Sequence, residues 1–167
     1  MVDTCRGHLF LVGDLQFMSV KVNVWLPTTF QDGVKTKAHA SLELSDGTYI
    51  SWAFRNNDDS RHDDIMRQTF REDLKREQRR PEKTYFIKPG KLEEDAMKAW
   101  WTKWWRDDVW RRQMPVWPLY TVFETLSVGQ KGYDIPEAQG IYMNHKQLIR
   151  YMKSNKLIIT NGSCVVT

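Results

Sequence analysis

One histidine is placed where a titratable side chain could act from a rigid element. Residues 39–52 predict a β-hairpin, because polar and apolar residues alternate, an Asp-Gly turn follows, and the return segment is rich in β-branched and aromatic residues. Alternation puts His39 on one face with Ser41 and Glu43, and the intervening alanine and leucines on the other. The apolar face is the core face, so we expect His39 to point outward or into a cleft. There an imidazole could serve as a general base.

A base of this kind needs a nucleophile, and the chain has two cysteines, Cys5 and Cys164. A catalytic thiol needs a lowered pKa, commonly from a helix N-terminus and a neighbouring imidazole. Only three residues follow Cys164, too few for such a helix, and nothing around Cys5 predicts a helix cap. Both are candidate nucleophiles, with an ordinary unreactive thiol as the alternative for each. Ser127 is a weaker candidate, because no base and orienting partner can be named for it.

The order of residues in the hairpin forms a longer motif around His39. His39-Ala40-Ser41-Leu42, an Asp-Gly turn and Tyr49-Ile50-Ser51-Trp52 follow one another. This order resembles the histidine motif of circularly permuted papain-like (NlpC/P60-type) cysteine hydrolases, with Ala38 where that family has glycine. A helix, a proline and a strand over residues 72–87 continue the resemblance. A helix from Leu92 and a segment at 118–123, similar to the strand before the family's nucleophile, extend it over about residues 20–155.

The resemblance implies an α+β fold in which a small antiparallel sheet carries His39 and packs against helices. Residues 1–160 would form this single permuted papain-like domain, and residues 161–167 a flexible tail. If active, such a domain would hydrolyse or transfer an acyl group from a protein or small-molecule substrate. A thiolate would attack the carbonyl, His39 would move the proton, and a polar residue on a neighbouring strand would orient the imidazole. Ser51 and Glu43 are both candidates for that orienting role.

The sequence departs from the family at the nucleophile. The family has Asn-Cys at a helix start, followed by a small polar residue and valine, whereas this chain has Thr125-Leu126-Ser127-Val128. Leucine has no nucleophilic atom. The chain is therefore either a degenerate enzyme, which is the interpretation we favour, or an enzyme in which another residue supplies the nucleophile. A non-enzymatic binding module is the alternative from a different class.

Tryptophan is concentrated in one predicted helix that begins at about Leu92. Pairs at spacing i, i+4 make a band of rings wider than one helix face can bury. The band could pack between the sheet and the segment around Trp117, or remain partly exposed for a protein, a lipid or an aromatic ligand. Trp52, Trp101 and Trp105 are the predicted ligand contacts. The tryptophans of the helix are Trp100, Trp101, Trp104, Trp105 and Trp110.

Three further elements follow from local patterns. Residues 19–26 alternate as a strand, and Asn144 predicts the cap of a short helix with an apolar face. Ser60 predicts the cap of a helix that ends before Pro81 and carries Met66, Phe70 and Leu74 as its apolar stripe.

Charge leaves a third functional alternative open. The basic run over residues 67–80 also contains acids, so at helical spacing it predicts a solvated face of opposed charges. The net charge of +4 and the isoelectric point near 9.1 allow a salt-sensitive attraction to phosphate. A basic nucleic-acid binder is therefore the third functional alternative, although the sequence contains no nucleic-acid-binding motif.

Composition limits the remaining choices. A chain of 167 residues that is 41% apolar can build one core, which predicts a single monomeric domain. No apolar run of membrane-spanning length and no signal segment occurs, so we expect a soluble, cytoplasmic protein. Two distant cysteines form neither a disulfide framework nor a zinc motif, and we expect no metal or other cofactor.

Overall fold

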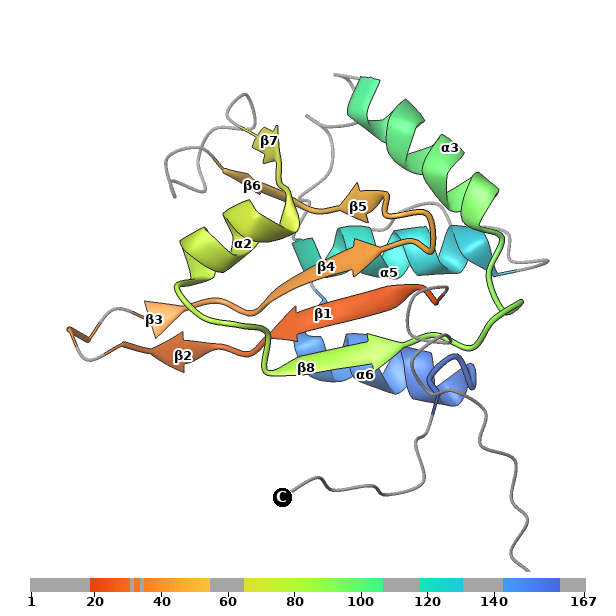
Figure 1. Cartoon of the computed structure of the whole chain (residues 1–167). Helices are drawn as coiled ribbons and strands as arrows, with labels where there is room; N and C mark the ends of the chain where they lie inside the picture. The colour runs from red at the N-terminus through yellow and green to blue at the C-terminus, as the bar shows by residue number, and fades with distance from the viewer. Residues whose placement is uncertain are drawn as a thin grey trace, which may run out of the picture.

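The computed structural model describes residues 19–30, 32–33, 35–54, 65–106, 118–130 and 143–159. Within these ranges the chain is an α+β body with a four-stranded antiparallel sheet, two small hairpins and four helices (Figure 1). The strands are β1 (Lys21–Trp25), β2 (Thr28–Thr29), β3 (Lys35–Thr36), β4 (His39–Glu43), β5 (Tyr49–Ile50), β6 (Trp52–Phe54), β7 (Ile65–Arg67) and β8 (Lys83–Phe86). The helices are α2 (Phe70–Glu77), α3 (Glu94–Arg106), α5 (Pro118–Gly129) and α6 (His145–Ser154).

The main sheet has the strand order β5-β4-β1-β8, and all its pairs are antiparallel. Both the predicted strand over residues 19–26 and the predicted hairpin are confirmed. Gly47 closes the turn with a φ of 83°, in the left-handed region that favours glycine. Thr48 donates its backbone N–H to the Asp46 carboxylate at 2.9 Å, which fixes the same turn from its other side.

The two faces of the sheet have different chemistry and different covers. The register puts Asn23 opposite Ser41 and Trp25 opposite His39, so these polar and aromatic side chains share one face. In Figure 1, α2 lies in front of β4 on that face, while α5 and α6 lie behind the sheet. The face behind carries the apolar core, which the sheet builds with side chains from α5 and α6. Its buried members include Val22, Val24, Ala40, Leu42, Ile50, Val122, Leu126, Leu148 and Met152.

The tryptophans of α3 pack inward as a stacked group. Trp101 and Trp104 are buried, with ring centroids 5.3 Å apart, and Trp104 meets Trp52 of β6 at 6.4 Å. Trp100 and Trp105 are only partly buried, which agrees with the expectation that one face cannot cover the whole band. Trp110 and Trp117 lie outside the described residues, as does the predicted tail at 161–167.

Two predicted elements are wrong. The segment 118–123, expected as a strand, is the first half of α5. That helix is buried on most of its sides, so its apolar residues do not form a single stripe, and periodicity alone cannot assign the segment to helix or strand. Proline at its first position is typical of a helix start.

The second error concerns the helix expected between residues 60 and 81. Met66 belongs to strand β7 and pairs with Ala53, and α2 begins only at Phe70. Thr69 is its N-cap, with a complete capping box to Glu72. Phe70, expected in an apolar stripe, is 39% exposed. Ser60 lies outside the described residues.

The C-terminal part agrees with its local signals. Asn144 caps α6 with a capping box to Gln147, as predicted. After α6 the chain returns along β8, where Ile158 bridges Ile87, so residues 157–159 extend the edge of the sheet. Among the helices that the structure describes, none is long and apolar enough to cross a membrane.

Candidate functional site

His39 is buried beneath α2, with 2% of its surface exposed. Its ring lies 5.2 Å from that of Trp25, its partner across the β1–β4 pair, and the expectation that it points outward or into a cleft is wrong. The cause is distant in sequence: α2 covers the polar face that the strand pattern leaves open. A substrate cannot touch the imidazole in this arrangement.

Asp73 of α2 is the charged partner of His39. Its Oδ1 lies 3.2 Å from Nε2 of the imidazole, and its side chain has no exposed surface. The capping box at Thr69 fixes where α2 begins, and Asp73 and Glu77 then lie one turn apart on the buried side. Burial alone would raise the pKa of Asp73, but its contacts with His39, Ser51 and Tyr49 hold that pKa below its ordinary value. The carboxylate is therefore ionised at neutral pH.

A chain of hydroxyl groups continues from Asp73 across the sheet. The Tyr49 hydroxyl lies 2.8 Å from Asp73 Oδ2 and 2.6 Å from Ser41 Oγ. It has a single proton and an ionised carboxylate only accepts, so Tyr49 donates to Asp73 and accepts from Ser41. Asn23 in turn donates to Ser41 at 3.3 Å. Burial and the Asp73 charge raise the pKa of Tyr49, which keeps the hydroxyl protonated as a donor.

The structure separates the two predicted orienting residues. Ser51 Oγ lies 3.3 Å from His39 Nε2, whereas the Glu43 carboxylate pairs with Lys21 Nζ at 3.0 Å. Ser51 and Asp73 therefore meet the same ring nitrogen, while Nδ1 is buried and has no hydrogen-bond partner among the residues that the structure describes. A Ser-His-Asp relay uses both nitrogens, one for the nucleophile and one for the carboxylate. The cluster has the residue types of such a relay without its geometry.

None of the predicted nucleophiles is brought to His39. Cys5 and Cys164 lie outside the described residues. Ser127 donates to the Phe123 carbonyl oxygen at 3.0 Å and lies 3.2 Å from the Tyr151 hydroxyl, so it belongs to the contact between α5 and α6.

The family's helix-start motif also falls elsewhere than expected. Residues 125–128 lie in the second half of α5, and the helix starts at Pro118, followed by Leu119, Tyr120 and Thr121, none of which carries a thiol. Moreover, α5 packs behind the sheet (Figure 1), whereas the His39 side chain contacts Asp73 of α2 on the opposite face, so strand β4 lies between them.

The predicted aromatic ligand contacts are largely occupied by protein. Trp52 and Trp101 are buried, and Trp52 donates its indole N–H to Thr121 Oγ1 at 2.8 Å. The Arg67 guanidinium lies over Trp105, 4.8 Å from the ring centroid, and 5.4 Å from that of Trp101. Their role in ligand binding stays a prediction.

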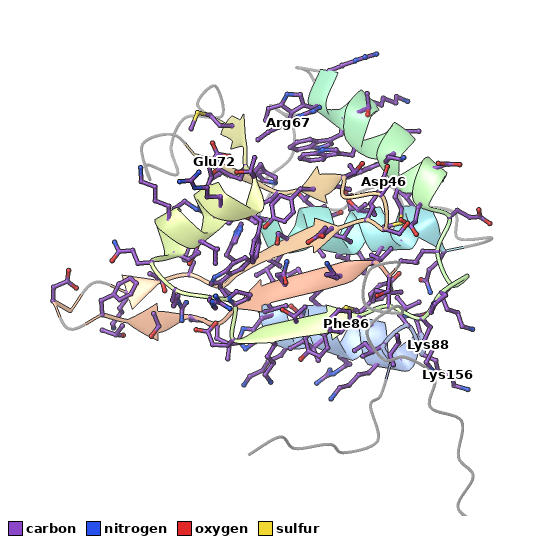
Figure 2. All side chains as sticks on the ribbon, viewed as in Figure 1. Asp46, Arg67, Glu72, Phe86, Lys88 and Lys156 are labelled. Atoms are coloured by element: carbon purple, nitrogen blue, oxygen red, sulfur yellow. The ribbon has the colours of Figure 1, made fainter. Side chains whose placement is uncertain are left out.

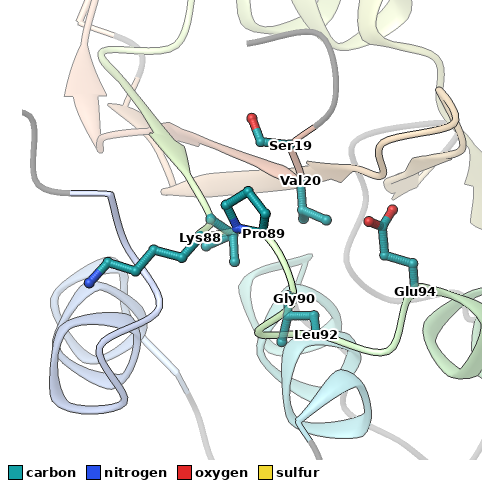
Figure 3. A pocket seen from close by; sticks show the side chains of 8 residues that line it. Ser19, Val20, Lys88, Pro89, Gly90, Leu92 and Glu94 are labelled. Carbon is teal, nitrogen blue, oxygen red and sulfur yellow. The ribbon is translucent and has the colours of Figure 1, made fainter. Parts of the chain in front are cut away.

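A small pocket opens at the other end of the sheet (Figure 3). Ser19, Val20, Pro89 and Glu94 are among its lining residues, and its cavity volume of about 20 Å³ is far below the roughly 300–1,000 Å³ typical of ligand sites. Glu94 is already engaged, since it accepts from the backbone and hydroxyl of Ser45. Within the described ranges no group of three histidine, cysteine, aspartate or glutamate side chains could hold a metal ion.

Asp73 and Tyr49 are the site residues that sequence reasoning missed. Asp73 was assigned to a solvated face of opposed charges, yet both it and Glu77 are buried. The available signal was the Thr69–Glu72 capping box, because a helix that begins there carries Asp73 and Glu77 on one side. Tyr49 was assigned to the hairpin without a partner across the site.

Comparisons with known proteins add no relative to this picture. No family model, no curated protein and no solved structure matches the chain. The site therefore has to be interpreted from its own geometry.

Proposed function

We propose that this chain is a degenerate domain of the permuted papain-like type, which keeps the sheet and the histidine but acts as a binding domain rather than a hydrolase. The observation that carries the proposal is the state of His39. Its imidazole is buried, and both of its polar partners, Ser51 and Asp73, meet the same nitrogen. A general base must instead reach its substrate or nucleophile.

In this proposal the buried pair has a structural role. His39 belongs to β4, Asp73 to α2 and Tyr49 to β5, so the network joins a helix to two strands of the sheet. Removing one member would leave the other as a buried polar group without its partner, which is strongly unfavourable. The pair therefore fixes α2 against the sheet and gives the domain a defined surface.

A cysteine hydrolase is the second candidate, and the His39–Asp73 pair is the observation that favours it. A carboxylate beside an imidazole is the usual support for a general base. Cys5 or Cys164 would have to supply the thiolate, and α2 would have to move away from His39 before the two groups could meet. This candidate predicts a thiol whose pKa depends on the imidazole.

The two candidates are separated by the pH dependence of iodoacetamide alkylation, measured for each cysteine by mass spectrometry. The binding-domain proposal predicts that both thiols titrate near the ordinary cysteine pKa of about 8.5 and do not respond to His39→Gln. A thiol that reacts well below that pH in the wild type, and loses this behaviour in His39→Gln, would overturn it.

A control is needed because His39 supports the fold. Glutamine keeps a polar side chain at this position, and circular dichroism and thermal unfolding show whether the variant is folded. Ser51→Ala is a second variant, which leaves both His39 and Asp73 in place. If both thiols titrate near pH 8.5 in Ser51→Ala as in the wild type, the evidence against a cysteine hydrolase does not depend on whether His39→Gln folds well.

A further inference from the structure

Helix α6 and the neighbouring end of β8 form a face that carries cations without acids among its described residues. We call it the basic face and define it by six residues. They are Lys83, Lys88, Lys146, Arg150, Lys153 and Lys156. All are exposed except Lys88, which is half-buried.

The geometry of α6 explains how this face forms. Leu148 and Met152, one turn apart, are fully buried and hold the helix against the core. Lys146, Arg150 and Lys153 follow the spacing i, i+4, i+7 on the side away from them. The cations of α6 thus form one stripe along a helix of ten residues, about 15 Å long.

Strand β8 adds a cation at one end of the stripe, and the residues directly after β8 add one at the other end. Lys83 faces the start of α6, where partial burial and the charges of Lys146 and Lys83 lower the pKa of His145. At the other end, the backbone of Lys88 donates to the Leu157 carbonyl oxygen at 2.8 Å. Lys88 and Lys156 consequently lie next to each other, as their labels in Figure 2 show.

No ion pair offsets these charges within the part of the chain that the structure describes. None of the six cations has a carboxylate partner there, whereas the cations of α2 and the turn after it include Arg76, paired with Glu77, and Arg79, paired with Glu82. Lys146 also occupies the first turn of α6, where the helix dipole disfavours positive charge and no acid compensates. A bound polyanion would relieve this repulsion.

The residues of the basic face favour one kind of polyanion over a lipid bilayer or a single-stranded nucleic acid. Phe70, the large hydrophobic side chain that is exposed in the described structure, belongs to α2 on the other side of the sheet. The face therefore offers neither an apolar anchor for a bilayer nor an exposed aromatic ring on which unpaired bases could stack. A regular array of phosphates needs only the cations.

We propose that the basic face binds the phosphate backbone of double-stranded nucleic acid, without reading its bases. This gives a partner to the binding domain proposed above and rests on that proposal. A stripe of cations on a convex helix, flanked by lysines of the adjacent strand, can contact phosphates on both sides of a groove. If all six cations contact phosphates, the logarithm of the binding constant should fall with the logarithm of the salt concentration with a slope of about −5.

The test uses the full chain and a fluorescein-labelled random 20-base-pair duplex, with binding followed by fluorescence anisotropy at several salt concentrations. The variant Lys146→Glu/Arg150→Glu/Lys153→Glu should lose affinity on the order of 100-fold or more, because three phosphate contacts become repulsive. The matched control, Arg71→Glu/Lys75→Glu/Arg80→Glu, makes the same change in net charge with exposed cations of α2 and the turn after it. It should retain affinity within about tenfold, since only long-range attraction is reduced.

Each other outcome contradicts the proposal in a defined way. Equal losses in both variants would show that net charge and not this face drives binding. Tighter binding to the single strand of the same sequence, or binding to phosphatidylserine vesicles but not to the duplex, would replace the duplex by another partner. A glutamine version of the α6 variant keeps the test valid if the glutamates impair folding. Absence of duplex binding leaves the cysteine titration unaffected, so the two proposals fail separately.

Discussion

Helices α2 and α6 begin in the same way but differ in where their charged side chains lie. Both start with a complete capping box, at Thr69 and at Asn144. Helix α2 turns two carboxylates, Asp73 and Glu77, toward the protein, while α6 has no acid and turns aliphatic side chains inward. In α2 the charges are part of the internal structure, whereas in α6 they are left to solvent. Whether acids accompany the cations of a basic segment therefore matters more to its role than how many cations it contains.

The difference also determines how each helix is held. Helix α6 is held by apolar burial, which does not depend on pH or salt to first order. Helix α2 is held by the buried pair of Asp73 and His39, whose members are each unfavourable to bury alone. The largest effects of mutation should consequently fall on α2, although it is the shorter helix.

Asp73→Ala is the substitution that should break α2 most severely. It leaves His39 buried without its carboxylate, and removing one partner of a buried pair costs about 3–5 kcal/mol of unfolding free energy. Guanidinium unfolding measures the change. Lys98→Ala is the control, because it removes an exposed ion pair with Asp46 but leaves the hydrogen bond of Asp46 to the hairpin turn in place, so it should have only a small effect.

A double-mutant cycle determines whether the loss belongs to the pair. His39→Leu/Asp73→Leu replaces both polar groups with apolar ones, and such a replacement can be close to neutral. We expect the double variant to be more stable than Asp73→Leu alone. Strict additivity of the two single changes, within about 0.5 kcal/mol, would contradict a coupled pair.

The buried Asp73 carboxylate should also make the protein sensitive to acid. The pKa of Asp73 is lower in the folded than in the unfolded state, so the carboxylate stabilises the fold fully above its unfolded pKa of about 3.9. That stability is lost as the pH falls through the folded pKa. The groups facing Asp73 are His39, Ser51, Tyr49 and Arg76, whose Nη2 lies 3.9 Å away.

Urea unfolding at pH 5 and at pH 2.5 measures this dependence. The stability difference between the wild type and Asp73→Asn should shrink as the pH falls, because the aspartic acid of the wild type becomes neutral like the amide. If the difference in unfolding free energy between the two proteins is the same at both pH values, the contacts of Asp73 with the imidazole and the hydroxyl groups do not lower its pKa in the folded state.

The sequence predicts the elements that depend on neighbours along the chain. The hairpin follows from an Asp-Gly turn between alternating residues, and the start of α6 from a single asparagine; both are confirmed. The burial of His39 could not be predicted in this way. It depends on α2, whose Asp73 lies 34 residues further along the chain, and strand alternation says only which residues share a face and not what covers that face. The start of α2 was misplaced because Ser60 was preferred to Thr69 as its cap.

The sequence predicts less well which charged side chains are paired, buried or exposed. The cations of residues 67–80 lie close together in the sequence, yet the structure pairs two of them, Arg76 and Arg79, with carboxylates and buries two acids of the same segment. The cations of the basic face are split between residues 83–88 and 146–156, and only the edge of the sheet brings them together. A pattern that depends on strand pairing is not visible in a window along the sequence.

The two capping boxes allow a direct measurement on both helices. Thr69→Ala and Asn144→Ala each remove one side-chain acceptor from a helix start, a change that typically costs about 1 kcal/mol. We expect Thr69→Ala to destabilise more, because the start of α2 also positions Asp73 beneath the sheet. Thermal unfolding of the two variants is sufficient to compare them. A larger loss for Asn144→Ala would contradict the idea that α2 is held by a precisely placed charge.

The smallest expected effect concerns α6 and separates stability from binding. Lys146→Glu puts an acid in the first turn of α6, where the helix dipole favours it, and removes the repulsion between Lys146 and Lys83 across the start of the helix. The variant should gain about 0.3–1 kcal/mol in unfolding free energy and lose duplex affinity. Lys153→Glu is the matched control: it removes the same charge from the basic face but lies in the last turn, where the dipole favours a cation, so it should lose stability by a similar amount.

We expect the two variants to change stability in opposite directions while both lose duplex affinity. This result would show that Lys146 contributes to binding and not to the stability of the fold. If Lys146→Glu instead lowers stability, the lysine contributes to the fold and the argument from its unfavourable position fails. If the two variants bind the duplex as tightly as the wild type, the stripe on α6 is only a solvated surface. Low ionic strength is the right condition for both measurements, because salt screens the dipole and the phosphate contacts alike.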